Sequence, residues 1–171
     1  MAEAHDESFR LFYAIWPDPA TSARLLPLLA PLHGRKTRQA DLHLTLAFLG
    51  NQPSSLLPVL KGVLKHLRVA QITLEIDRLG QFPRNRITWA GMTAPPAALF
   101  ALQKELVEAL SLRNVAFERE AVYRPHITLA RNTDGPAQTQ FPAIRWRADK
   151  VVLARSTGRS PGPKYDILAS H

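Results

Sequence analysis

The feature that most constrains this sequence is a five-residue pattern, His-x-Thr-Leu-Ala, which occurs at residues 43–47 and again at residues 126–130. In both copies the residue at x is apolar, and β-branched and large apolar residues dominate the pattern. Such a composition predicts a short β-strand. The fold must therefore accommodate two similar strands from distant parts of the chain.

Each predicted strand presents one imidazole and one hydroxyl on the same face. Because alternate side chains of a strand share a face, His43 lies with Thr45, and His126 lies with Thr128. Residues two apart in a strand are separated by about 7 Å, so one imidazole and one hydroxyl can reach the same phosphate-sized group. The alternation places apolar side chains on the other face of the first strand, namely Leu44, Leu46 and Phe48.

Two imidazoles and two hydroxyls suit acid–base chemistry at a phosphate. One neutral ring can accept a proton from a nucleophile while a protonated partner donates one to a leaving oxygen. The hydroxyls can donate to non-bridging oxygens and hold the phosphorus between the rings. A single His-x-Thr also occurs in ordinary half-buried strands, so the repetition is what favours catalysis. No metal or cofactor is expected, because neither copy has a zinc-ligand spacing and the sequence has no cysteine.

The paired motifs resemble those of the 2H phosphoesterase superfamily, in particular its RNA 2′,3′-cyclic phosphodiesterase branch, once described as 2′-5′ RNA ligases. Three segments carry the resemblance, at residues 10–17, 41–50 and 125–131, and they read RLFYAIWP, DLHLTLAFLG and PHITLAR. The resemblance implies an α+β fold of two duplicated lobes, in which two antiparallel sheets line a central groove and helices lie outside.

The resemblance also implies roles for individual residues. His43 corresponds to the proton donor and His126 to the proton acceptor in the hydrolysis of an RNA 2′,3′-cyclic phosphate to a 2′-phosphomonoester, with 2′-5′ ligation as the reverse reaction. Spacing alone does not tell which ring is the acid. Thr45 and Thr128 are expected to bind phosphate oxygens. Arg131 is a candidate phosphate clamp, although strict alternation puts it on the wrong face unless the strand ends or bulges.

Two alternatives share part of this pattern. A 2H phosphoesterase acting on a small cyclic nucleotide would carry the same motifs. A non-catalytic RNA-binding module would need no matched proton donor and acceptor. The net charge of +8 favours an acidic partner such as nucleic acid, although the positive residues are spread along the chain.

The 171 residues suit a single domain, 1–171, made of two pseudo-symmetric lobes, because a strand, a helix, a loop and a His-x-Thr strand follow one another twice. The first helix begins at Asp18-Pro19 and is predicted to end at His33-Gly34. Residues 132–142 are predicted to form a loop, followed by strands at 148–156 and 164–169.

Hydropathy and the N-terminal residues bear on location. No apolar run approaches 18 residues, so no membrane span is expected. Residues 1–8 are acidic and lack the apolar segment of a signal peptide. We therefore expect a cytoplasmic monomer.

Overall fold

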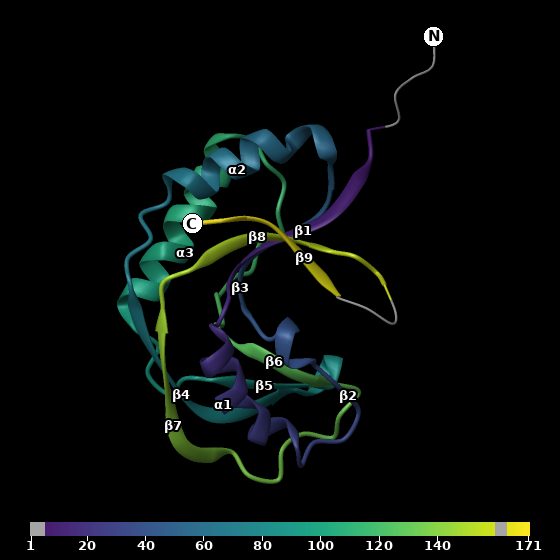
Figure 1. Cartoon of the computed structure of the whole chain (residues 1–171), viewed down its shortest axis with the longest axis vertical. Helices are drawn as coiled ribbons and strands as arrows, with labels where there is room; N and C mark the ends of the chain where they lie inside the picture. The colour runs from purple at the N-terminus through teal and green to yellow at the C-terminus, as the bar shows by residue number, and fades with distance from the viewer. Residues whose placement is uncertain (1–5, 160–163) are drawn as a thin grey trace.

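The computed structural model describes residues 6–159 and 164–171 of the chain, and within these it forms a sheet of nine strands with three α-helices (Figure 1). The strands are β1 (Ser8–Ile15), β2 (Arg35–Lys36), β3 (Leu44–Pro53), β4 (Ile72–Phe82), β5 (Ile87–Gly91), β6 (Ile127–Arg131), β7 (Gln140–Ala148), β8 (Val151–Ser156) and β9 (Tyr165–Ser170). The α-helices are α1 (Pro19–Leu29), α2 (Leu57–His66) and α3 (Ala97–Leu112). Short 3-10 turns are η1 (Gln39–Asp41), η2 (Ser54–Leu56) and η3 (Pro83–Asn85).

The strands form one antiparallel sheet in the order β7-β4-β5-β6-β3-β1-β8-β9, with β2 paired to β6. The predicted α+β class is confirmed. The two expected sheets are joined, however, through one residue pair, Leu44 of β3 with Ile127 of β6. We call this pair the seam. It separates a first half-sheet (β3, β1, β8, β9) from a second half-sheet (β7, β4, β5, β6).

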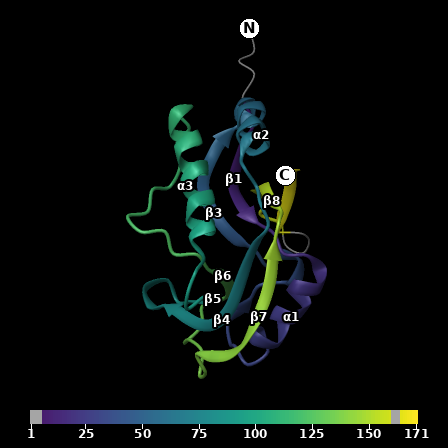
Figure 2. The same cartoon turned by 90° about the vertical axis from the view of Figure 1, so that its left-hand side faces the viewer.

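Helices α1 and α3 pack against strands from the other half of the sequence. Helix α1 lies between β1 and β3 in the sequence but packs against β6 and β7 of the second half-sheet. Helix α3 immediately precedes β6 but packs against β3, and α2 packs against β8 and β9 (Figures 1 and 2). Each half-sheet is thus covered in part by a helix from the other half of the repeated sequence order.

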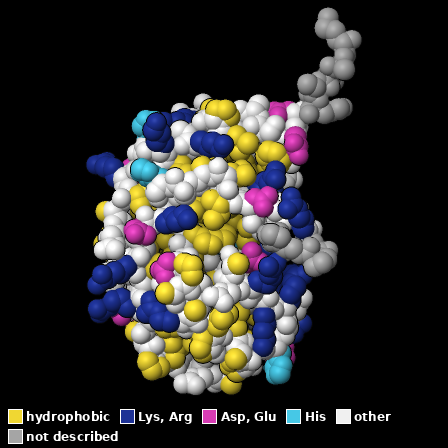
Figure 3. All heavy atoms as spheres, in the orientation of Figure 1, with side chains coloured by type: hydrophobic (Ala, Val, Ile, Leu, Met, Phe, Trp, Pro, Cys, Tyr) yellow, Lys and Arg dark blue, Asp and Glu magenta, His cyan; other side chains and the backbone are white. Residues whose placement is uncertain are grey.

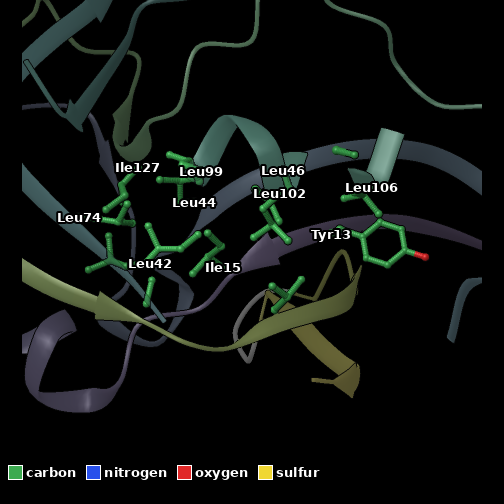
Figure 4. Close-up of a cluster of buried hydrophobic side chains, with 14 of the residues drawn as sticks. Tyr13, Ile15, Leu42, Leu44, Leu46, Leu74, Leu99, Leu102, Leu106 and Ile127 are labelled. Atoms are coloured by element: carbon green, nitrogen blue, oxygen red, sulfur yellow. The ribbon is translucent and has the colours of Figure 1, made fainter. Parts of the chain in front are cut away.

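The hydrophobic core runs without a break through the seam. Leu44 and Ile127 are fully buried and lie beside Leu42 in the same cluster (Figure 4). Helix α3 contributes a stripe of buried leucines at helical spacing, namely Leu99, Leu102, Leu106 and Leu110. The seam therefore depends on side-chain packing far more than on backbone pairing.

Helix α1 is shorter than predicted. Asp18 caps its N-terminus as expected, with a side-chain oxygen accepting from the backbone N–H of Thr21 at 2.9 Å. The helix ends at Leu29 and not at residues 33–34, because Pro31 follows closely and cannot continue it. Gly34 has a φ of +91°, and a Cβ at this position would overlap the backbone oxygen of Arg131. Gly34 therefore allows the backbone to lie close to β6, and it does not cap the helix.

Strand β7 was missing from the sequence prediction, which assigned residues 132–142 to a loop and no structure to residues 143–147. Exposed Arg145 and Arg147 alternate with buried Trp146 and Ala148, so β7 is a charged edge strand whose apolar signal is weak.

No helix among the described residues is long and apolar enough to cross a membrane. Residues 1–5, which form most of the segment predicted to lack a signal peptide, lie outside the described residues.

Candidate active site

Strand β6 carries a β-bulge inside the second motif. Adjacent residues of β5 pair with Thr128 and Ala130, which leaves Leu129 as the extra residue. A bulge shifts the alternation by one position. Leu129 and Ala130 are both buried, and Arg131 is half-buried like Thr128. Arg131 therefore lies on the face of Thr128, and the condition under which it can reach the site is met.

Strand β3 carries the same bulge at the equivalent place in the first motif. Adjacent residues of β1 pair with Thr45 and Ala47, which leaves Leu46 as the extra residue. Phe48 therefore lies on the face of His43, and the prediction that it points the other way is wrong. Its ring centroid lies 5.6 Å from that of Phe12, which in turn lies 5.0 Å from His43.

The seam sets the two motifs in register. Leu44 and Ile127 point into the core, so their sequence neighbours point to the opposite face of the sheet. One residue further along each strand, the antiparallel register sets His43 beside Thr128. By the same register, Thr45 comes to lie beside His126. Each imidazole therefore has a hydroxyl two residues away in its own strand and a second one across the seam.

Both imidazoles are held by the same backbone contact. The Nδ1 atom of His43 lies 2.7 Å from the carbonyl oxygen of Asp41, and Nδ1 of His126 lies 2.7 Å from that of Arg124. A carbonyl oxygen only accepts, so Nδ1 carries the proton and donates it. The Nε2 atom of each neutral ring is left with a free lone pair that can accept a proton.

Aromatic rings enclose His43. Trp16 stacks on it at 4.9 Å with an interplanar angle of 8°, and Phe12 and Tyr165 lie at 5.0 and 5.1 Å. This burial lowers the pKa of His43 to about 4, against the opposing effect of the Asp41 carbonyl. The positive charges of Lys164 and Arg131 and the nearby His126 lower the pKa further.

The surroundings of His126 differ from those of His43. Phe82 meets its ring edge-on at 4.9 Å, and Trp89 lies at 6.4 Å. Burial lowers the pKa of His126, while the Arg124 carbonyl and Glu120 act in the opposite direction and Arg131 adds to the lowering. The charge of Arg131 thus lowers the pKa of both imidazoles.

Side-chain hydroxyls fix the backbone of both motif strands. The Tyr123 hydroxyl donates to the carbonyl oxygen of Thr45 at 2.8 Å, and the Thr37 hydroxyl donates to that of Thr128 at 2.9 Å. This contact with the Thr45 backbone gives Tyr123 a structural role. Phe12, on the neighbouring strand β1, is only 1% exposed.

Sequence reasoning missed the aromatic enclosure and the two carbonyl contacts. Trp16 continues the alternation of Phe12 and Ala14 along the first strand, and this signal could have placed it near His43. Tyr165 is brought in by β9, and only the tertiary structure reveals this contact. Among residues 6–159 and 164–171, no cluster of three or more His, Asp or Glu side chains could hold a metal ion.

On the face of the molecule viewed in Figure 3, hydrophobic side chains gather near the middle, and Lys and Arg side chains lie on both sides of them. Positive charge of this kind attracts an anionic partner such as nucleic acid.

Known proteins resemble this chain in sequence and in fold. The RNA 2′,3′-cyclic phosphodiesterase of Escherichia coli is 31% identical over 144 residues, covering 82% of this chain and 81% of that protein. The one from Methanocaldococcus jannaschii is 32% identical over 141 residues, covering 75% and 78%. The crystal structure of E. coli LigT complexed with 3′-AMP matches with a TM-score of 0.86 and 28% identity, covering 96% of this chain and 98% of that one.

A family model described as the 2′-5′ RNA ligase superfamily matches residues 13–159, a range that includes both His-x-Thr strands. The family predicted from the paired motifs is confirmed, and the predicted enzyme class is the one for which the curated relatives are named. This chain belongs to the 2′-5′ RNA ligase superfamily.

Proposed function

We propose that the protein hydrolyses RNA ends that carry a 2′,3′-cyclic phosphate and leaves a 2′-phosphomonoester. The observation that carries the proposal is the pair of imidazoles, each with its Nδ1 fixed by a carbonyl, set in register across the seam with two threonine hydroxyls. The curated relatives are named for the same substrate. Their names also weaken the alternative of a non-catalytic RNA-binding module.

The proposed reaction needs one base and one acid on opposite sides of the phosphorus. His126 removes a proton from water through Nε2 as the water oxygen attacks the phosphorus. The bond between phosphorus and the 3′ oxygen breaks, and His43 donates a proton to that oxygen. The products are a 2′-phosphate and a 3′-hydroxyl. With a 5′-hydroxyl in place of water as the nucleophile, the same attack on the cyclic phosphate forms a 2′-5′ linkage and frees the 3′-hydroxyl. The assignment of acid and base follows the family resemblance.

Three further side chains are proposed to bind the phosphate. Thr45 and Thr128 have half-buried hydroxyls on the face of the imidazoles and can donate to the non-bridging oxygens. Arg131, turned to that face by the bulge, can offset the negative charge that remains on the phosphate during the reaction. All three groups lie in or beside the seam.

The low pKa of His43 has to be reconciled with its role as an acid. In the ligand-free protein the ring is neutral at pH 7, because its pKa lies at about 4. A bound phosphate anion favours the charged form of a nearby imidazole and raises its pKa. The bound substrate therefore favours protonation of His43, and His43 later donates this proton to the leaving oxygen. His126 is already neutral in the free protein, as a base must be.

The remaining expectations stay predictions. They are a monomeric and cytoplasmic protein, a reaction that needs no metal or cofactor, and RNA as the partner in preference to a small cyclic nucleotide. The comparisons support a phosphate-bearing nucleotide as the class of ligand, since the E. coli structure contains 3′-AMP.

The decisive experiment is incubation with an oligonucleotide that ends in a 2′,3′-cyclic phosphate, followed by identification of the product isomer. We expect a 2′-phosphate, turnover that survives EDTA, and a bell-shaped pH profile. A 3′-phosphate product, or no turnover, would contradict the proposal. A parallel reaction with a mononucleoside 2′,3′-cyclic phosphate tests the small-nucleotide alternative.

Replacement of either imidazole tests the mechanism. We expect His43→Ala and His126→Ala each to lower kcat by about 10²–10⁴-fold, the usual contribution of one acid or base. Melting temperatures should change little, since both rings border the site. His66→Ala, on the exposed side of α2, is the matched control and should retain full turnover. Loss of folding in both site variants would instead indicate a structural role for the two histidines.

A further inference from the structure

On the face of the first half-sheet that carries His43, a row of aromatic rings extends from this imidazole and ends at a positive charge. The ring of Phe12 lies 5.0 Å from His43, the ring of Phe48 lies 5.6 Å from Phe12, and the guanidinium of Arg10 lies over Phe48 at 5.8 Å. Arg10 and Phe12 share this face because they are two residues apart in β1. We call these three residues the Arg10 track.

The bulge in β3 is what completes the track. Without it, Phe48 would point into the core, and Arg10 would have no ring beneath it. Phe12 is almost fully buried, whereas Phe48 is half-buried and Arg10 is exposed. The surface of the track that a ligand can reach therefore consists of the Phe48 ring and the Arg10 guanidinium.

Positive charge continues beyond Arg10. An open cavity at the end of β1 and β8 is lined by Arg10, Arg155 and Arg159, together with Glu7, Ser8, Phe9, Ser156 and Thr157. The Arg155 guanidinium is already paired with Asp166 at 3.0 Å, and Glu7 adds a negative charge. Of the arginines on the track side, Arg10 is the one that stands directly after the rings.

The proposed reaction fixes which nucleoside lies on this half-sheet. Attacking and leaving oxygens lie roughly in line on opposite sides of the phosphorus. The leaving 3′ oxygen belongs to the terminal ribose and receives its proton from His43. The terminal nucleoside must therefore lie on the His43 side, where the rings of the first half-sheet surround that imidazole.

The RNA upstream of that nucleoside can then extend along β1 toward Arg10. Arg10 stands four residues before Ala14 in β1, and Ala14 pairs with Thr45. Four residues of a strand span about 13 Å. This distance would be filled by a terminal base that packs against Phe48 and by the next phosphate of the RNA near Arg10. The flexible side chain of Arg10 can move toward that phosphate.

We propose that Arg10, with Phe48, forms a binding subsite for the phosphodiester upstream of the cyclic phosphate, so that the enzyme prefers an RNA end over a mononucleotide. This inference rests on the proposed function. An aromatic ring that supports a base, followed by a guanidinium for the backbone phosphate, is a common way to bind single-stranded RNA.

The test compares three substrates: adenosine 2′,3′-cyclic phosphate, the dinucleotide ApA with a 2′,3′-cyclic phosphate end, and the same dinucleotide with an uncharged methylphosphonate as its internal linkage. We expect Arg10→Ala to lower kcat/KM on the charged dinucleotide by about tenfold, the effect of one charge-assisted hydrogen bond. We expect no change on the mononucleotide or on the methylphosphonate. Arg10→Lys should retain part of the preference.

Arg147→Ala is the matched control, because Arg147 is an exposed arginine on β7, at the opposite edge of the sheet. It should leave kcat/KM unchanged on all three substrates. An equal loss on all three with Arg10→Ala, or no loss on any, would overturn the inference while leaving the proposed function intact. If the wild-type protein hydrolyses neither cyclic phosphate, the proposed function itself fails.

Discussion

At the scale of single residues, His43 shows how its surroundings set the chemistry of an imidazole. Three aromatic rings surround it and reduce its contact with water, while one carbonyl fixes its tautomer. Burial makes the charged form unfavourable, and so its pKa falls to about 4. The same enclosure strengthens the effect of any phosphate charge that enters, because the local dielectric is low.

This lowered pKa predicts how stability depends on pH. Between pH 6.5 and about 4, the unfolded chain binds a proton at His43 that the folded protein does not. The free energy of unfolding should therefore fall as the pH drops through this window, by at most about 3 kcal/mol from this one group. Chemical denaturation at several pH values measures it.

The His43→Asn variant isolates this contribution. It should lose less stability than the wild-type protein between pH 6.5 and 4, and the two curves should run parallel above pH 7. His66→Asn, on the exposed α2 surface, is the control and should follow the wild-type curve. If the free energies of unfolding of the wild type and of His43→Asn changed in parallel over the whole pH range, burial would not lower the pKa of His43 as described.

At the scale of the elements, the bulges and the glycines decide which side chains reach the site. Leu46 and Leu129 are extra residues at equivalent places in β3 and β6. Each places the side chain two residues further along, Phe48 or Arg131, on the face that carries the imidazoles. In the second half-sheet, Gly80 and Gly91 allow the Trp89 ring to lie against the sheet. A Cβ at Gly80 would overlap this ring.

Two glycine-to-alanine variants should therefore act in opposite directions. Gly80→Ala forces the Trp89 ring away from the sheet and should lower the free energy of unfolding by about 1–3 kcal/mol, as overpacking does. Gly62→Ala, inside α2 with open space around it, should raise it by about 0.5–1 kcal/mol. Urea denaturation of both variants checks this, and an unchanged or higher stability for Gly80→Ala would contradict the account of Trp89.

At the scale of the whole molecule, the site exists because two half-sheets meet along a seam with a single backbone pair. Core packing around Leu44 and Ile127 and the two hydroxyl contacts hold the halves in register. The exchange of helices between the halves adds to this, since each half-sheet needs a helix from the other half of the sequence to cover it. The geometry of the two imidazoles therefore depends on the integrity of the whole chain.

A pair of tyrosine variants separates stability from site geometry. Tyr123→Phe removes the bond to the Thr45 carbonyl, and Tyr13→Phe removes an equivalent bond to the Leu60 carbonyl. Each should lower the free energy of unfolding by about 1–2 kcal/mol. Only Tyr123→Phe should also lower kcat, because only that bond lies beside a motif strand. Equal kcat values for the two variants would contradict the proposed link.

The sequence by itself determined the two motif strands, the family and the α+β class, and it supplied the hypothesis of paired acid–base chemistry. These depend on local patterns: alternation in a strand, a capped helix start, and a repeat of five residues. Local patterns also explain the errors. A charged edge strand such as β7 lacks an apolar signal, and a proline after α1 ended a helix whose leucines continued its period.

Only the tertiary structure decided where Phe48 and Arg131 point, which rings enclose His43, and which helix covers which half-sheet. A bulge depends on how a strand pairs with its neighbours and on how its side chains pack into the core. Neither can be read from the sequence of one strand alone. Tyr165 reaches His43 from the far end of the chain for the same reason. Contacts between distant segments depend on how the whole core packs, and that information is spread over the entire sequence.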